Sequence, residues 1–272
     1  MKILYLDCSM GAAGDMLAAA LLELLPDPEQ FVERLNDLQL PSVTFQMESA
    51  VKCGIVGTHM RVYVNGDAEE ISHHDHGHSH RDDHGHSHMC GHSHHAHHSL
   101  HDITQIVSHL ELPQAVQKNI LAVYNLIAEA ESHVHGQPIS EIHFHEVGTL
   151  DAIADVTAVC LLLYELAPEQ ILSSPVNVGS GQVHCAHGIL PVPAPATAQL
   201  LQRIPTYGSQ IPGELCTPTG AALLRYFVQT FGSQPPMCVE RIGYGCGQKD
   251  FEMANCVRAM LGKSIECSGM GH

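Results

Sequence analysis

The amino-acid sequence predicts an α/β fold, a mixed sheet packed with helices that carries a disordered, histidine-rich insertion. Three observations predict it. Residues 2–6 form a short apolar run that is followed by a glycine-containing turn and a helical pattern. In residues 43–64, apolar and polar side chains alternate, which predicts two strands joined near residues 52–54. Residues 73–101 contain fourteen histidines in twenty-nine positions and almost no core-forming side chain, so they should remain outside the core.

The other elements are expected in order along the chain. Apolar periodicity predicts helices over residues 16–25, 28–38, 101–110, 114–134, 150–166 and 195–203, and one more after residue 217. Residues 237–262 are typical of two strands around a glycine-rich bend. We therefore divide the chain into an N-terminal α/β segment (1–72), a histidine-rich metal-binding loop (73–98), the remainder of the same domain (99–262) and a tail (263–272).

Composition excludes several classes of protein. Twelve basic against twenty-nine acidic residues give a formal charge of −17, which argues against nucleic acid and anionic membranes as partners. Ten cysteines without a CxxC pair favour the reducing cytosol over a secreted disulfide framework. The apolar N-terminus is interrupted by Asp7 and Asp15, so a strand and a helix fit it better than a signal peptide. We expect a soluble, cytoplasmic protein.

Residues 143–155, HFHEVGTLDAIAD, hold the densest cluster of chemically active side chains. His143 and His145 would point to the same side of a strand, and Glu146 follows at once. Asp151 and Asp155 are one helical turn apart. Two imidazoles and up to three carboxylates suit a divalent transition metal. Taken singly, each of these residues could be structural, because helix dipoles favour an aspartate in the first turn.

The histidine-rich loop should act as a flexible, polydentate site for nickel, zinc or copper, because neutral imidazoles ligate all three. The alternative is a solvated low-complexity loop without a role. Its candidate ligands are His73, His74, His76, His78, His80, His84, His86, His88, His92, His94, His95, His97 and His98.

Two helix starts are candidate anion sites. Gly11 and Gly14 lie in the turn after the first strand, where free backbone N–H groups could meet an anion, although a glycine-softened turn explains them equally well. Thr217, Thr219 and Gly220 open a later helix, where a phosphate or carboxylate and simple capping are equally good explanations. No P-loop is present, because the triplet at 262–264 lacks its upstream glycine.

Four motifs in order, DCSMGAAGDM (7–16), HFHEVGTLDAIADV (143–156), GELCTPTGAALL (213–224) and GYGCGQKDFEMANCVRAMLG (243–262), together with the histidine-rich insertion, resemble the LarC-type family of nickel-insertion proteins of nickel-pincer cofactor biosynthesis. The resemblance implies a cyclometallase, a metal-chelating enzyme of the lyase class. It would place nickel in a thiolated pyridinium mononucleotide, forming one carbon–nickel and two sulfur–nickel bonds, with CTP and Mg²⁺ or Mn²⁺. The product would serve lactate racemase.

The resemblance also implies a further C-terminal domain that holds the nucleotide site. This chain ends at His272, so we expect that domain, or a separate polypeptide equivalent to it, to be a partner. The oligomeric state is left open, a homo-oligomer included.

Forming a carbon–nickel bond requires removal of a ring proton, for which His145, Glu146, Asp151 and Asp155 are the candidate bases. The expected nickel ligands of the cluster are His143, His145, Glu146 and Asp155. Two other functions compete with the enzyme. One is a non-catalytic nickel or zinc storage or delivery protein, for which the loop alone would suffice. The other is a hydrolase with two metals held by Asp7, Asp15 and the 143–155 cluster.

Overall fold

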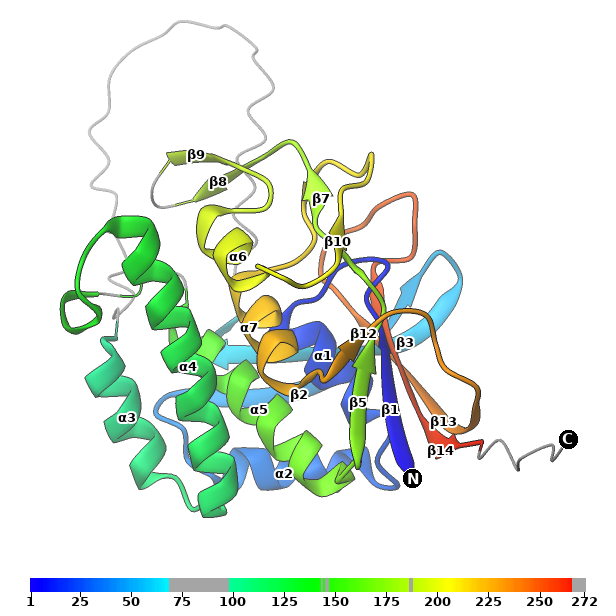
Figure 1. The fold of residues 1–272 in the computed structure, drawn as a ribbon. Helices are drawn as coiled ribbons and strands as arrows, with labels where there is room; N and C mark the ends of the chain where they lie inside the picture. The colour runs from blue at the N-terminus through cyan, green and yellow to red at the C-terminus, as the bar shows by residue number, and fades with distance from the viewer. Residues whose placement is uncertain (69–97, 143, 145–146, 186–187, 266–272) are drawn as a thin grey trace, which may run out of the picture.

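A computed structural model of the protein describes residues 1–68, 98–142, 144, 147–185 and 188–265 (Figure 1). One mixed sheet forms the frame, with strand order β12-β5-β1-β14-β13-β3-β2 and the short β4 paired with β3. The pairs β12–β5, β5–β1 and β13–β3 are parallel, and the others are antiparallel. Its strands are β1 (Lys2–Asp7), β2 (Val43–Lys52), β3 (Ile55–Val64), β4 (Asp67–Ala68), β5 (Gln170–Ser173), β12 (Thr230–Phe231), β13 (Met237–Cys246) and β14 (Cys256–Ser264).

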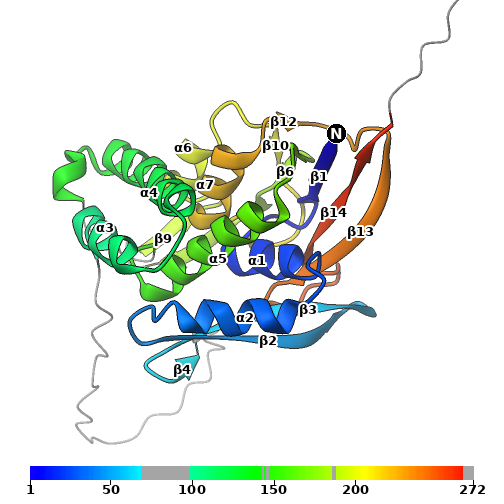
Figure 2. The ribbon, with the colours of Figure 1, turned by 90° about the horizontal axis from the view of Figure 1, so that it is seen from below.

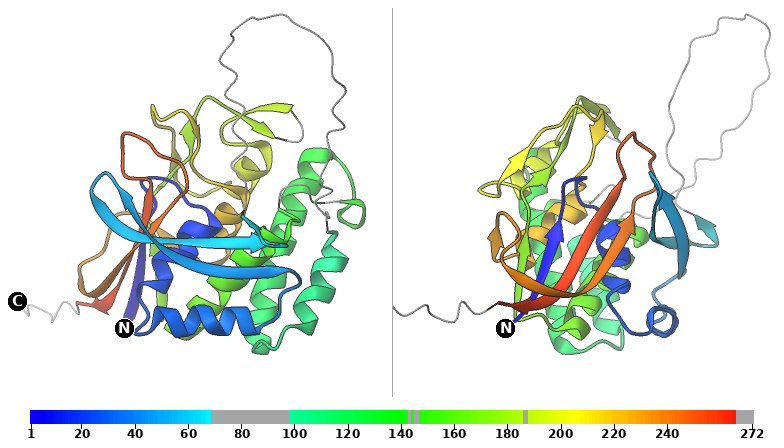
Figure 3. Two further views of the ribbon diagram at one scale, coloured as in Figure 1. Left: turned by 180° about the vertical axis from the view of Figure 1, so that it is seen from behind. Right: turned by 90° about the vertical axis from the view of Figure 1, so that its right-hand side faces the viewer.

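The helices lie on one side of this sheet (Figures 2 and 3). They are α1 (Gly14–Leu22), α2 (Pro28–Asp37), α3 (Leu100–His109), α4 (Gln114–His135), α5 (Leu150–Leu166), α6 (Pro195–Leu200) and α7 (Pro218–Phe227), with a 3-10 turn, η1 (Ile139–Glu141). Three small ladders complete the described fold: β6 (Val176–Asn177) with β10 (Thr206–Tyr207), β7 (Gly179–Ser180) with β11 (Gly213–Glu214), and β8 (Gln182–Cys185) with β9 (Gly188–Pro191).

The two faces of β1 bury different sets of residues, because successive side chains of a strand point to opposite faces. Leu4 and Leu6 belong to the main core, which also contains most of α1 and α5. Ile3 and Tyr5 belong to a small second cluster with Met260 on the other face. The main core is therefore built between the sheet and its helices.

Glycines set how closely α1 approaches its neighbours. A Cβ on Gly245 of β13 would lie 1.9 Å from the Met16 carbonyl oxygen, and one on Gly243 would lie 2.1 Å from that of Ala20. On its other side, a Cβ on Gly14 would lie 2.6 Å from Oδ2 of Asp155 in α5. Helix α1 is thus clamped between the sheet and α5, with its N-terminus against the start of α5.

Most of the expected elements are confirmed within one or two residues. The strands at 43–64 and 237–262 and the helix at 150–166 all form. The strand expected around residue 143 is wrong, because Ile142 and Phe144 lie outside any strand and both are buried instead. Helix α6 ends at Leu200 rather than at residue 203.

Two described regions lie at the expected segment boundaries. Strand β14 continues through Lys263 and Ser264, where Ser264 N–H donates to the Met1 carbonyl at 3.0 Å, so the sheet reaches into the expected tail. At its C-terminal end, the expected histidine-rich loop includes His98, which is described and whose Nδ1 lies 3.1 Å from the Gly148 carbonyl oxygen. Residues 69–97, which carry the other candidate ligands of that loop, lie outside the described residues. None of the helices in the described part of the chain is long and apolar enough to cross a membrane.

Candidate functional site

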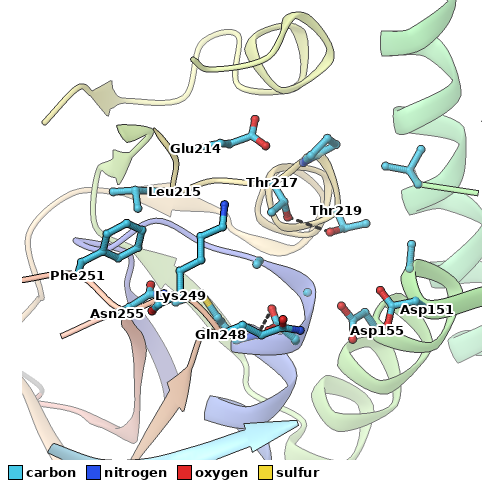
Figure 4. A pocket seen from close by; sticks show the side chains of 18 residues that line it. Asp151, Asp155, Glu214, Leu215, Thr217, Thr219, Gln248, Lys249, Phe251 and Asn255 are labelled. Carbon is cyan, nitrogen blue, oxygen red and sulfur yellow. Dashed lines mark hydrogen bonds between the residues drawn. The ribbon is translucent and has the colours of Figure 1, made fainter. Parts of the chain in front are cut away.

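A cleft of about 340 Å³ opens at the carboxyl ends of β1 and β13 (Figure 4). This size falls within the range of small-molecule sites, and ligands of open α/β sheets bind at that edge. Four segments form its walls: the start of α1, the start of α5 with Val147 before it, the segment that leads into α7, and the loop between β13 and β14. All four overlap the motifs singled out in the sequence.

Three carboxylates line one side of the cleft. Asp15, half-buried in the first turn of α1, accepts a hydrogen bond from the Met16 N–H at 2.8 Å, and burial raises its pKa to about 6. Asp151 and Asp155 both come from the first turns of α5, and Asp155 is only 7% exposed. The absence of a side chain at Gly14 lets α1 approach Asp155 closely. The acidic wall is therefore built by the contact of two helix N-termini.

Phe144 and Val147 are held in place beside this wall. Their neighbours His143, His145 and Glu146 lie outside the described residues. Phe144 is buried with its ring centroid 6.0 Å from that of Tyr124. The Tyr124 hydroxyl, whose pKa is raised well above the usual value by burial and then by the charge of Asp155, donates to the Val147 carbonyl at 3.3 Å. Val147 itself lines the cleft.

The third wall is the segment that leads into α7, and its threonines both cap this helix and line the cleft. The Thr217 hydroxyl accepts from the Gly220 N–H at 3.2 Å, which caps α7, and it lies 3.0 Å from the Thr219 hydroxyl. Both threonines also line the cleft. Gly220 does not line it, because it allows α7 to pack on the first loop: a Cβ there would lie 2.2 Å from the Ala12 carbonyl oxygen.

Gly11 likewise has a packing role. Its φ is +84°, and a Cβ would lie 1.9 Å from the Leu215 carbonyl oxygen, so only glycine fits the approach of these two loops. Ala12 N–H then donates to that carbonyl at 3.0 Å, and Thr217 N–H donates to the Ala12 carbonyl at 3.0 Å. The two loops that open α1 and α7 are therefore held together by backbone hydrogen bonds.

The fourth wall lies within the motif at 243–262, but the sequence predicted no site residue there. Gln248, Lys249, Phe251 and Asn255 of the β13–β14 loop line the cleft opposite the carboxylates (Figure 4). The sequence predicted the bend but assigned it no chemistry. The only signal was a lysine and two amides beside glycines, a pattern that is equally common in surface turns.

One other predicted residue, Asp7, lies outside the cleft. Asp7 pairs with Arg258 at 2.6 Å and accepts from the Ser9 N–H at 3.1 Å, and it does not line the cleft. The two-metal arrangement that included Asp7 is therefore not favoured by the structure.

The described carboxylates do not make a metal centre by themselves. No group of three or more His, Cys, Asp or Glu within residues 1–68, 98–142, 144, 147–185 and 188–265 is arranged to hold a metal ion. The fold and cleft define an α/β protein with an acidic, small-molecule-sized site at the carboxyl edge of its sheet.

Comparison with known proteins gives the family. The family described as "Nickel insertion protein" matches residues 4–270, and the chain belongs to it. Relatives named "Pyridinium-3,5-bisthiocarboxylic acid mononucleotide nickel insertion protein" include one from Geobacillus kaustophilus, 37% identical over all of this chain and 62% of the relative. One from Clostridium kluyveri is 41% identical over 97% of this chain and 62% of its own length. This chain thus spans about 62% of the length of these relatives. No solved structure matches it.

Proposed function

We propose that this chain inserts nickel into a thiolated pyridinium mononucleotide, the substrate in the names of its relatives, and so contributes to a nickel-pincer cofactor such as that of lactate racemase. The observation that carries the proposal is that Asp15, Asp151 and Asp155 line, together with Val147, a cleft large enough for a nucleotide-sized ligand. Nickel is the cargo of this reaction, and it reaches a site of oxygen and nitrogen donors.

The donors suit a metal that must be released. Imidazole and carboxylate compete with water for nickel, whereas a sulfur-rich substrate offers softer ligands that take the ion over. We assign His143, His145, Glu146 and Asp155 as nickel ligands. We assign the removal of the ring proton to one of His145, Glu146, Asp151 and Asp155, whose two described members lie in the cleft.

The histidine-rich segment is proposed to supply the ion. Its last histidine, His98, is half-buried, and its backbone N–H and Nδ1 lie 3.4 Å and 3.1 Å from the Gly148 carbonyl oxygen. Gly148 follows Val147 of the cleft wall directly. Nickel bound along the preceding segment would therefore be tethered near the acidic wall, which raises its local concentration there.

CTP with Mg²⁺ or Mn²⁺ remains an expectation of the family resemblance. The triplet at 262–264 is not a phosphate-binding loop, because it lies inside β14, where Lys263 pairs with Glu240 at 2.8 Å. No step of the proposal therefore uses CTP. We also propose that a partner supplies a nucleotide site, because the chain spans only 62% of the length of the relative.

Substitution of Asp155 by asparagine tests the proposal, because the amide keeps the shape of the side chain and removes its charge. We expect nickel insertion to be lost while the melting temperature is kept or rises, since one of three neighbouring carboxylate charges is removed. Insertion is measured by the absorption of the nickel–sulfur product, and stability by thermal unfolding of the same preparation. Asp37→Asn on the exposed end of α2 is the matched control.

The result separates a ligand from a core residue. A destabilised Asp155→Asn protein that inserts nickel normally per folded molecule would show that Asp155 serves the core, and the proposed site would be wrong. The cost expected of a purely structural carboxylate is about 1–3 kcal/mol.

A further inference from the structure

Lys249 is the only cationic side chain among the described residues that line the cleft. It extends from the β13–β14 loop toward the wall of Thr217 and Glu214, across the cleft from Asp151 and Asp155 (Figure 4). Within the described part of the chain it forms no ion pair. A positive charge that points into a site without a protein partner is available to an anionic ligand.

The backbone of Lys249 is fixed even though its side chain is exposed. Its carbonyl oxygen accepts from Nζ of Lys52 at 3.2 Å and from Nδ2 of the buried Asn255 at 2.8 Å. Lys52, at the end of β2, also donates to the Gln248 carbonyl at 3.1 Å and pairs with Asp250 at 2.6 Å. Because the loop is held in place from two sides, less conformational entropy is lost when Lys249 binds a ligand.

Charge in the cleft is therefore unevenly distributed. Asp151 and Asp155 lie on one side, whereas Lys249 extends toward the wall that carries Thr217 and Glu214. Oε1 of Glu214 already accepts two hydrogen bonds. A phosphate monoester carries about −1.5 to −2 charges at neutral pH, so it is repelled by the carboxylates and attracted to the lysine. The ring end of a pyridinium mononucleotide would then face the carboxylates, where a bound nickel ion compensates their charge.

We infer that Lys249 binds the phosphate of the mononucleotide and so directs the metal-accepting end of the ring to the acidic wall. The inference rests on the proposed function and assigns the orientation of the mononucleotide in the cleft. Glu214 offers the competing explanation, because an ion pair with Lys249 across the cleft would make the lysine a structural residue. One oxygen of Glu214 already accepts from the Ala194 N–H and the Thr197 hydroxyl, both at 3.3 Å.

Calorimetric titration of the metal-free chain with two probes tests the inference. Nicotinate mononucleotide carries the ring, ribose and phosphate, and nicotinate riboside lacks only the phosphate. We expect Lys249→Ala to weaken binding of the mononucleotide by about ten-fold, the lower end of the range for a charged hydrogen bond because the side chain is exposed, and to leave riboside binding unchanged. Lys249→Arg should restore most of the affinity, and Lys263→Ala, on the far end of β14, should equal the wild type.

Three results would overturn the inference: equal losses for both probes, no loss for either, or a wild-type chain that binds the mononucleotide no more tightly than the riboside. Nickel insertion, measured separately on the wild type, distinguishes this failure from failure of the proposed function. If the wild-type chain inserts nickel but binds the mononucleotide and the riboside equally well, only the role of Lys249 is contradicted. Phosphate discrimination in a wild-type chain that neither binds nor inserts nickel supports Lys249 and contradicts the proposed function.

Discussion

Replacing Gly14 by alanine should damage stability and nickel insertion together. The added Cβ would lie 2.6 Å from Oδ2 and 2.7 Å from Cβ of Asp155, both shorter than ordinary van der Waals contact. Relief requires α1 to move away from α5 or Asp155 to rotate out of the acidic wall. Movement of α1 is opposed on its other side, where Gly245 already brings β13 against the Met16 carbonyl. Overpacking of this kind costs about 1–3 kcal/mol.

The gain in helix propensity from glycine to alanine, about 1 kcal/mol in a helix interior and less at this first position, offsets only part of that cost. For a domain of this size, we expect the melting temperature to fall by roughly 2–8 °C. Gly232→Ala is the matched control, because no atom lies within 4 Å of its added Cβ and its φ is ordinary. Thermal unfolding and nickel insertion are measured on both variants. A Gly14→Ala protein that is as stable and as active as Gly232→Ala would refute the close contact of α1 and α5 at the site.

Three further outcomes are expected. Deletion of residues 73–97, which keeps His98, should leave nickel insertion intact at saturating nickel and reduce it at limiting nickel. Loss of all nickel-dependent function would instead favour the storage protein. Lys52→Met should raise the KM for the mononucleotide several-fold with little change in kcat, because three acceptors on the β13–β14 loop lose their donor; an unchanged KM contradicts this positioning role. Burial raises the pKa of Asp15 from 3.8 to about 6, so the native state holds a proton that the unfolded chain releases. The stability that this proton provides is present below about pH 4 and is lost as the pH rises through 6. Asp15→Asn in metal-free protein should therefore reduce the change of the unfolding free energy with pH over that interval. An unchanged pH dependence contradicts the shift.

The elements of the fold could be predicted because their signals are local. Period-two alternation identified β2 and β3, and the apolar run after Thr149 identified α5. The failure at residue 143 has a physical cause. The pattern around Phe144 alternates as a strand does, but packing of Phe144 against Tyr124 provides its burial without any pairing to the sheet. Tertiary contact overrides local preference there.

The candidate site was predictable in part for the same reason. Asp155 and Thr217 stand at helix starts, whose position in a fold is read from capping residues and periodicity. Lys249 stands in a loop, and its position depends on contacts with Lys52, nearly two hundred residues earlier in the chain. No pattern around Lys249 records that contact, so its role becomes visible only when the strands are assembled.

The attachment points of the histidine-rich segment make it an exchangeable part of the protein. Ala68, the last described residue before it, pairs with Tyr63 of β3, and His98, the first described residue after residue 97, contacts Gly148. Doubling the number of residues in a chain segment between two fixed ends adds only about 0.6 kcal/mol of closure entropy. We therefore expect insertions and deletions between these two anchor residues to leave the cleft intact. An engineered version rich in methionine and cysteine would direct the same fold toward softer ions such as Cu(I).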